Sequence, residues 1–423
     1  MKLLKRHFQR VTRRLLYFLA VLGPGLITAS ADNDAPGIAT YSMAGSRYGY
    51  SFLWLLVVVT VGEVIVQEMA ARMGAVTGKG TADLVRERFG VRITTFAMLS
   101  LLLANAGTTM AQFAGVAAGT ELLGVSRYLT VPLAALLVGF LVLRGSYPRV
   151  EKVLLVLSLA ALSYVVTAIV INPPWDRILL EAVTPSLRAD PNYILAVLST
   201  IGTTITPWAI VYMQASVADK GVTKETYSAT RTDVIFGAAW GNLVSGFILI
   251  CTAATLFGAG IVADSAADAA LALEPLAGVG ARYLFSTGLL GASLLAASVL
   301  PLSTAYAICE AFGWERGLNH RVRDAPIFYG LYLTMIVVSV LIVLIPGLPL
   351  FPIMWFSQAL NALLLPVMLV LVLKLVNDRR VMGDWRNSRL QNVLAWGLTA
   401  MIGAVAILLL VSSILPGLTE PGL

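Results

Sequence analysis

The sequence predicts an all-α protein that crosses a membrane many times. Of its 423 residues, 58% are hydrophobic and 13% are charged, and the mean hydropathy is +0.83. Soluble domains carry about 25% charged residues and about 45–50% apolar ones, so a soluble enzyme, a nucleic-acid-binding protein and a disordered scaffold are excluded. Proline and polar residues interrupt two of the apolar segments near their middle. This pattern predicts two halves, each opened by a broken helix.

Apolar segments long enough to span a bilayer, about 20 residues each, recur along the whole chain. We find eleven, at about 15–45, 50–72, 93–122, 128–147, 152–171, 192–219, 232–259, 280–313, 326–346, 349–375 and 392–415. We therefore expect a single transmembrane domain over 1–423, with helices 1–5 in about 15–171, helices 6–10 in about 192–375 and helix 11 in about 392–415.

Lysine and arginine fall almost entirely on alternate loops. With the N-terminus in the cytoplasm, 25 of the 30 basic residues lie on the cytoplasmic side and five on the other. Cytoplasmic loops of membrane proteins carry such an excess. We therefore expect a multi-pass protein of the cell membrane, with a cytoplasmic N-terminus and its C-terminus on the opposite side. The net charge of +7 then reflects topology, and no nucleic-acid partner is expected.

Cysteine and histidine are scarce. Cys251 and Cys309 lie inside apolar segments, and His7 and His320 lie outside them. We interpret both cysteines as reduced packing residues. The histidine positions argue against a zinc site or an intramembrane histidine relay, and with no nucleophile–histidine set we expect no enzyme and no cofactor.

The first interruption reads Asp-Asn-Asp-Ala-Pro-Gly over 32–37. A carboxylate near the bilayer centre costs about 2.5–3.5 kcal/mol, so Asp32 and Asp34 indicate a cavity, a partner or a cation. The alternative is an interfacial loop between two short helices, but each flanking stretch is too short to span a membrane.

The second interruption reads Gly-Thr-Thr-Ile-Thr-Pro-Trp over 202–208. Broken helices at corresponding positions of two halves are typical of inverted-repeat transporters that bind their substrate at the midplane. Unwound backbone supplies carbonyl oxygens, and half-helix ends supply partial charges. Together with the carboxylates and threonine hydroxyls, these groups predict a site for a hard cation.

The side chains at the two breaks indicate which cation. Neither break contains cysteine, histidine or methionine, whereas oxygen ligands suit magnesium, calcium and manganese. Magnesium keeps several waters and takes one or two carboxylates, which fits Asp34 with its small neighbours. Ligand type alone leaves sodium and calcium open.

Several blocks of the sequence resemble the NRAMP divalent-metal transporters. They are GPGLITASADNDAPGIATYSMAGSRYGY (23–50), QEMAARMGAVTGKGTADLVRERFG (67–90), CEAF (309–312) and SQALNALLLP (357–366). The resemblance implies a LeuT-type fold: two inverted five-helix repeats plus an eleventh helix, with helices 1 and 6 broken at the midplane. Members of that family usually import manganese or ferrous iron together with protons.

The resemblance also implies a ligand set. It places the metal ligands at Asp34, Gly37, Thr203, Thr206 and Gln358, with Asp32, Ala35 and Thr204 as further candidates. Asp34 and Gln358 keep the family's residue types. The family's asparagine position is Gly37 and its sulfur ligand is Thr206, so we expect a larger cavity and a more hydrated ion.

Three further departures from the family pattern lie at positions where the family has residues that carry protons. The family's third-helix aspartate and glutamate are here Thr109 and Gln112, and its sixth-helix histidine is Trp208. None of these can relay a proton at physiological pH. The pattern resembles the divergent NRAMP-related magnesium transporters, which implies import of Mg²⁺, with Mn²⁺ tolerated, by alternating access and without proton coupling.

Two alternatives stay open. One is a proton-coupled Mn²⁺/Fe²⁺ importer of the same fold. The other is a sodium-coupled carrier of organic solutes, although Asp32 and Asp34 would repel a carboxylate substrate. The partners expected in any case are the cation substrate and the lipid bilayer.

Other polar residues inside apolar segments are candidates as well. Glu63 and Glu310 are intramembrane acids and so candidates for function, although Glu310, which matches a family position, also fits a structural role. Glu63 is expected to line a vestibule or to pair with a polar neighbour. Asn105 and Asn361 are expected either to support the cation site or to bond between helices.

Overall fold

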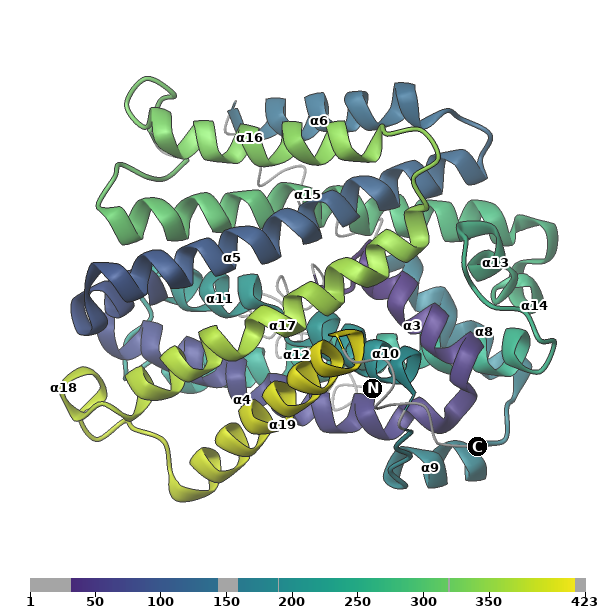
Figure 1. The fold of residues 1–423 in the computed structure, drawn as a ribbon, viewed down its shortest axis with the longest axis horizontal. Helices are drawn as coiled ribbons and strands as arrows, with labels where there is room; N and C mark the ends of the chain where they lie inside the picture. Colours follow the sequence, from purple (N-terminus) through teal and green to yellow (C-terminus); the bar gives the residue numbers. More distant parts are fainter. Residues whose placement is uncertain (1–31, 144–158, 189, 319, 415–423) are drawn as a thin grey trace, which may run out of the picture.

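Apolar helices make up the protein, as the sequence predicts. A computed structural model describes residues 32–143, 159–188, 190–318 and 320–414, and every regular element within them is helical. Eight helical stretches of this part are long and apolar enough to cross a membrane, and two shorter apolar helices accompany them. Figure 1 shows long helices crossing one another at shallow angles.

The helices follow the predicted segments in order. They are α3 (Ala35–Tyr48), α4 (Leu53–Thr77), α5 (Thr81–Leu122), α6 (Arg127–Leu143), α8 (Ser163–Ile171), α9 (Trp175–Val183), α10 (Pro191–Thr204), α11 (Pro207–Asp219), α12 (Tyr227–Thr252), α13 (Ala266–Leu271), α14 (Glu274–Ala277), α15 (Ala281–Phe312), α16 (Pro326–Val343), α17 (Leu350–Asn377), α18 (Arg379–Met382) and α19 (Arg389–Ile414). Predicted boundaries in 1–31 and 144–158, and the end at 415, lie outside the described residues.

The third predicted helix begins earlier than expected. It was placed at about 93–122, but α5 begins at Thr81, with a non-helical residue at Gly90. The first turns are amphipathic, because Leu84 and Val85 are buried while Glu87 and its neighbours are exposed. A search for continuous apolar segments misses such a turn, whose charges face outward.

The long helices pack around the broken ones. α5 packs along α15, and α17 packs against both α5 and α10; Figure 1 shows α5 and α15 side by side, with α17 crossing the middle of the molecule. On the other side, α4 contacts α11 and α12. Both cysteines are free and buried, as the sequence predicts.

One glycine allows the closest of these approaches. A Cβ atom on Gly202 of α10 would lie 1.9 Å from the carbonyl oxygen of Gln358 and 2.8 Å from the amide nitrogen of Ala362, both on α17. Only a residue without a side chain fits there. The end of α10 is therefore held directly against the α17 backbone.

Candidate cation site at the broken helices

Two prolines free a backbone carbonyl at each break. A helical carbonyl accepts from the amide four residues later, and for Asp32 and Thr203 that residue is Pro36 and Pro207, respectively. Proline has no N–H to donate. Each break therefore leaves a main-chain oxygen without its helical partner, where a cation can use it.

Asp34 is positioned by the helix that follows it. It is the N-cap of α3, and its Oδ1 accepts from the Gly37 amide at 2.8 Å. Its Oδ2 accepts from Nε2 of Gln112, on α5, at 2.5 Å. The residue is 3% exposed. Asp34 therefore caps α3, and its carboxylate stays fixed and buried.

Gly37 lies directly against oxygens of both breaks. A Cβ atom there would lie 3.1 Å from Asp34 Oδ1, 3.2 Å from the Asp32 carbonyl oxygen and 3.5 Å from Thr203 Oγ1. The carboxylate, the carbonyl and the hydroxyl thus lie together beside Gly37, where any side chain would crowd them. The fold brings these three predicted ligand positions together.

The three threonines of the second break differ in their partners. Thr203 Oγ1 is buried and has no hydrogen-bond partner among the described residues. Thr204 Oγ1 bonds to the Tyr41 hydroxyl at 2.7 Å, and Thr206 Oγ1 donates to Asp32 Oδ1 at 3.2 Å. The hydroxyl with unused capacity is therefore that of Thr203.

Gln358 lies beside the site but is bonded elsewhere. Its Nε2 donates to Ser357 Oγ at 2.9 Å, and its Oε1 accepts from Asn361 at 3.0 Å. Asn361 also donates to Thr108 Oγ1 at 2.8 Å. Gln358 reaches the second break through its backbone, which packs on Gly202, so a cation contact would need these amide bonds to change.

Gln112, Thr109 and Trp208 stand where the resemblance places the family's proton-carrying residues. Their surroundings differ. Gln112 belongs to the site, because its amide holds Asp34 and its Oε1 accepts from the Ala35 amide at 3.4 Å. Thr109 Oγ1 donates to the Asn105 carbonyl of its own helix at 2.7 Å. Trp208 is fully buried in a small apolar cluster. None of the three side chains is ionisable at neutral pH.

The remaining intramembrane polar residues form specific contacts. Glu310 Oε1 accepts from the Gly80 amide at 3.0 Å, which ties the α4–α5 connection to the end of α15. Asn105 donates to Thr304 Oγ1, also on α15, at 2.7 Å. Asn361 and Asn105 therefore bond between helices, which was one of the two roles expected for them.

Several residues that border the first break were not among the predicted candidates. Asn33 Nδ2 donates to the Gly241 carbonyl at 3.2 Å, and its Oδ1 accepts from Ser245 at 3.0 Å. Asn242, on the same helix α12, donates to Glu63. Polar residues one turn apart in an apolar segment were the available signal.

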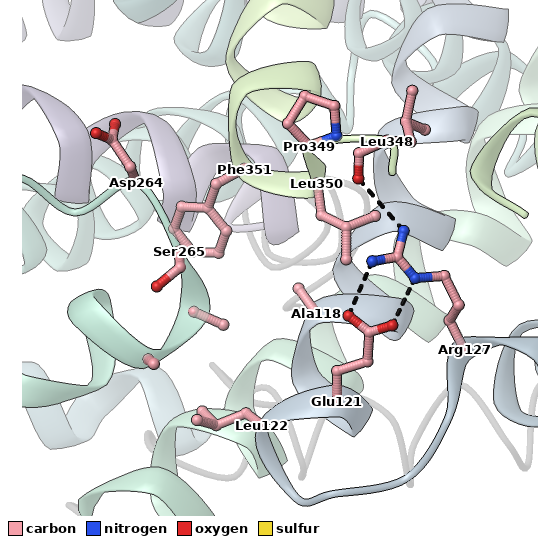
Figure 2. Close-up of a pocket in the computed structure, with 12 residues that line it drawn as sticks. Ala118, Glu121, Leu122, Arg127, Asp264, Ser265, Leu348, Pro349, Leu350 and Phe351 are labelled. Carbon is pink, nitrogen blue, oxygen red and sulfur yellow. Dashed lines mark hydrogen bonds and ion pairs between the residues drawn. The ribbon is translucent and has the colours of Figure 1, made fainter. Parts of the chain in front are cut away.

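A larger pocket lies away from the breaks. Its volume is about 490 Å³, and it lies among the ends of α5, α6 and α17 and the connection before α13 (Figure 2). Figure 2 shows the carboxylate of Glu121 facing Arg127, with contacts of 2.5 and 3.0 Å. The guanidinium of Arg127 is paired with Glu121. It therefore offers no free positive charge to a ligand in this pocket.

Comparison with known proteins gives the family. A family model described as natural resistance-associated macrophage protein-like, Nramp, matches residues 25–412. The chain belongs to this family. The match spans both broken helices and confirms the resemblance seen in the sequence.

Individual relatives agree along nearly the whole chain. A protein of Klebsiella pneumoniae named divalent metal cation transporter MntH is 28% identical over 410 residues, covering 94% of this chain and 95% of that protein. A manganese transporter structure from Eremococcus coleocola superimposes with a TM-score of 0.76 at 24% identity, covering 96% of this chain and 89% of that one.

A more distant structure confirms the fold class. Mhp1, a nucleobase-cation-symport-1 family transporter, superimposes with a TM-score of 0.59 at 14% identity, covering 92% of this chain and 91% of that one. The prediction of a LeuT-type, all-helical membrane fold is therefore confirmed.

Proposed function

We propose that this NRAMP-family protein imports Mg²⁺, with Mn²⁺ tolerated, by alternating access and without proton coupling. The observation that supports the proposal is the meeting of three oxygens from the two broken helices beside Gly37, each within 3.1–3.5 Å of the position that a Cβ atom on this glycine would take. Asp34 is the principal ligand. Asp32 and Thr203 supply carbonyl oxygens, and Thr206 and Gln358 supply water-mediated contacts.

Ligand chemistry supports magnesium. Within the described residues, no three histidine, cysteine, aspartate or glutamate side chains gather in a way that could hold a metal. A cation at the breaks would therefore rely on one carboxylate, neutral oxygens and water, which suits magnesium because it dehydrates reluctantly. The absence of sulfur removes the ligand that favours softer metals.

The membrane potential supplies enough energy for uncoupled import. A dication gains about 4.6 kcal/mol per 100 mV, and about 1.4 kcal/mol corresponds to a tenfold concentration ratio. The potential alone thus supports a gradient of about a thousandfold. The neutral side chains of Gln112, Thr109 and Trp208 agree with a protein that needs no proton path.

The second candidate is proton-coupled import of Mn²⁺. The names of the relatives favour it, because one is called a divalent metal cation transporter and another a manganese transporter. The two candidates differ in selectivity and in proton movement, so one assay separates them.

The test is ion uptake by the purified protein in vesicles that contain a Mg²⁺ or Mn²⁺ indicator together with a pH indicator. We expect Mg²⁺ entry with unchanged internal pH, and loss of uptake in Asp34→Ala. Asp176→Ala, an exposed acid on α9, is the control and should transport normally. Near-normal uptake by Asp34→Ala would overturn the assignment, and internal acidification in step with metal entry would overturn uncoupled transport.

A further inference from the structure

A second group of oxygens lies beside the Asp34 site. Asp32, Glu63 and Thr203 line an internal cavity of about 10 Å³, enough for one water-sized occupant. The walls come from the first break, α3, α4, α10 and α12. Asp34 does not line this cavity, so the two carboxylates here are additional to the principal ligand.

Glu63 is held in a fixed orientation. Its Oε1 accepts from Gln67 Nε2 at 2.5 Å, and its Oε2 accepts from Asn242 Nδ2. The residue is 3% exposed. Two amide donors fix a buried carboxylate from two helices, and each carboxylate oxygen retains further acceptor capacity.

Asp32 and Glu63 line the same small cavity. Asp32 Oδ1 accepts from Thr206 at 3.2 Å. Two carboxylates this close repel strongly in a medium of low dielectric constant. A positive group between them removes the repulsion.

The Thr203 hydroxyl points to a ligand independently of the acids. It is 3% exposed, lines the cavity and lacks a hydrogen-bond partner among the described residues. A buried hydroxyl without a partner costs about 1–3 kcal/mol. The same oxygen lies 3.5 Å from the position that a Cβ atom on Gly37 would take, so it borders both the cavity and the oxygens beside Gly37.

We propose that Asp32, Glu63 and Thr203 form a second divalent-cation site that the transported ion occupies in alternation with the Asp34 site. The shared Thr203 hydroxyl and the carbonyl and carboxylate of Asp32 let the ion exchange ligands without leaving oxygen. The pair of carboxylates matches the charge of a dication. This inference rests on the proposed function, since it assumes a divalent substrate.

Calorimetric titration of the purified full-length protein with Mg²⁺ tests the second site. We expect Asp34→Ala to keep measurable binding that is about tenfold weaker, and the double variant with Glu63→Gln to lose it. Glu68→Gln in the same Asp34→Ala background is the control, because Glu68 is a buried acid of the same helix whose partners are Arg72 and Tyr227. This double variant, Asp34→Ala with Glu68→Gln, should keep the residual Mg²⁺ binding.

Two results would overturn the second site: no residual binding in Asp34→Ala, or residual binding that survives Glu63→Gln. Equal size-exclusion profiles for all variants establish that they fold. In vesicles, Glu63→Gln alone should lower the rate of Mg²⁺ uptake about tenfold; an unchanged rate would likewise contradict a second site on the transport path. Failure of the proposed function itself has a different signature, absence of Mg²⁺ uptake by the wild type.

Discussion

Gln112 donates its side-chain amide to the carboxylate of Asp34, Nε2 to Oδ2, at 2.5 Å. Both residues are buried, and the bond joins α5 to the first break. The position that the resemblance assigns to a lost proton carrier thus holds a neutral donor that orients Asp34, the proposed principal ligand.

Replacing Gln112 with alanine should weaken metal uptake. Hydrogen bonds to charged groups contribute about 1.5–3 kcal/mol, so we expect the KM for Mg²⁺ to rise about tenfold or more. Thr109→Val is the matched control on the same helix, because the Thr109 hydroxyl bonds to its own helix backbone. The measurement is the concentration dependence of uptake in vesicles, and equal KM values for the two variants would contradict the orienting role of Gln112.

Thr206→Met should change the selectivity between metals. The substitution replaces the hydroxyl by a thioether at the position that the resemblance assigns to the sulfur ligand of the NRAMP family. Sulfur favours softer transition metals over magnesium. We expect Mg²⁺ uptake to fall while Mn²⁺ uptake persists, measured as competition between the two ions. Thr206→Ser, which keeps the oxygen, should retain the wild-type ratio. A Thr206→Met variant that transports Mg²⁺ normally would place the ion away from Thr206.

Gly202→Ala should destabilise the protein by forcing α10 away from α17. The added Cβ would meet backbone atoms of α17 at 1.9 and 2.8 Å, and backbone cannot yield as a flexible side chain can. Overpacking of this kind costs about 1–3 kcal/mol, so the thermal unfolding midpoint in detergent should fall. Gly330→Ala, a helical position with nothing within 4 Å, is the control and should raise the midpoint or leave it unchanged. Equal midpoints would mean that α10 and α17 separate readily.

The orientation in the membrane has its own test. The distribution of lysine and arginine predicts a C-terminus opposite the cytoplasm. A C-terminal alkaline phosphatase fusion should therefore be active in cells, and a C-terminal green fluorescent protein fusion should be dark. The converse pair of results would reverse the predicted topology.

Most of the fold could be predicted from the sequence, because membrane-spanning segments and broken helices leave strong local signals. Proline and acids within an apolar segment mark the first break, and proline with threonines marks the second. The bonding of Gln358 was not predictable, because it depends on Ser357 and on how α17 packs against α10. The contact of Glu63 with Asn242 joins residues far apart in the chain, and no local pattern specifies such a pair.

Glu310 should control how tightly the predicted cytoplasmic side is closed. Its carboxylate accepts from the Gly80 amide at 3.0 Å, and Arg86 donates to the neighbouring Ala311 carbonyl at 2.8 Å. Cys309 lies beside this contact and is fully buried. Glu310→Ala removes the acceptor, which leaves a buried amide unsatisfied at a cost of about 1–3 kcal/mol. The closed arrangement should therefore open more often.

The native cysteine reports that opening. In a Cys251→Ser background, we expect Glu310→Ala to raise the rate of Cys309 labelling by a membrane-permeant maleimide about tenfold. Gly80→Ala should act in the same direction, because its Cβ would lie 2.1 Å from a Glu310 carboxylate oxygen. Glu310→Gln keeps an acceptor for the Gly80 amide. In this variant, Cys309 should be labelled as slowly as in the parent. If all three variants label at the rate of the parent, the contact between Glu310 and Gly80 does not hold this side closed.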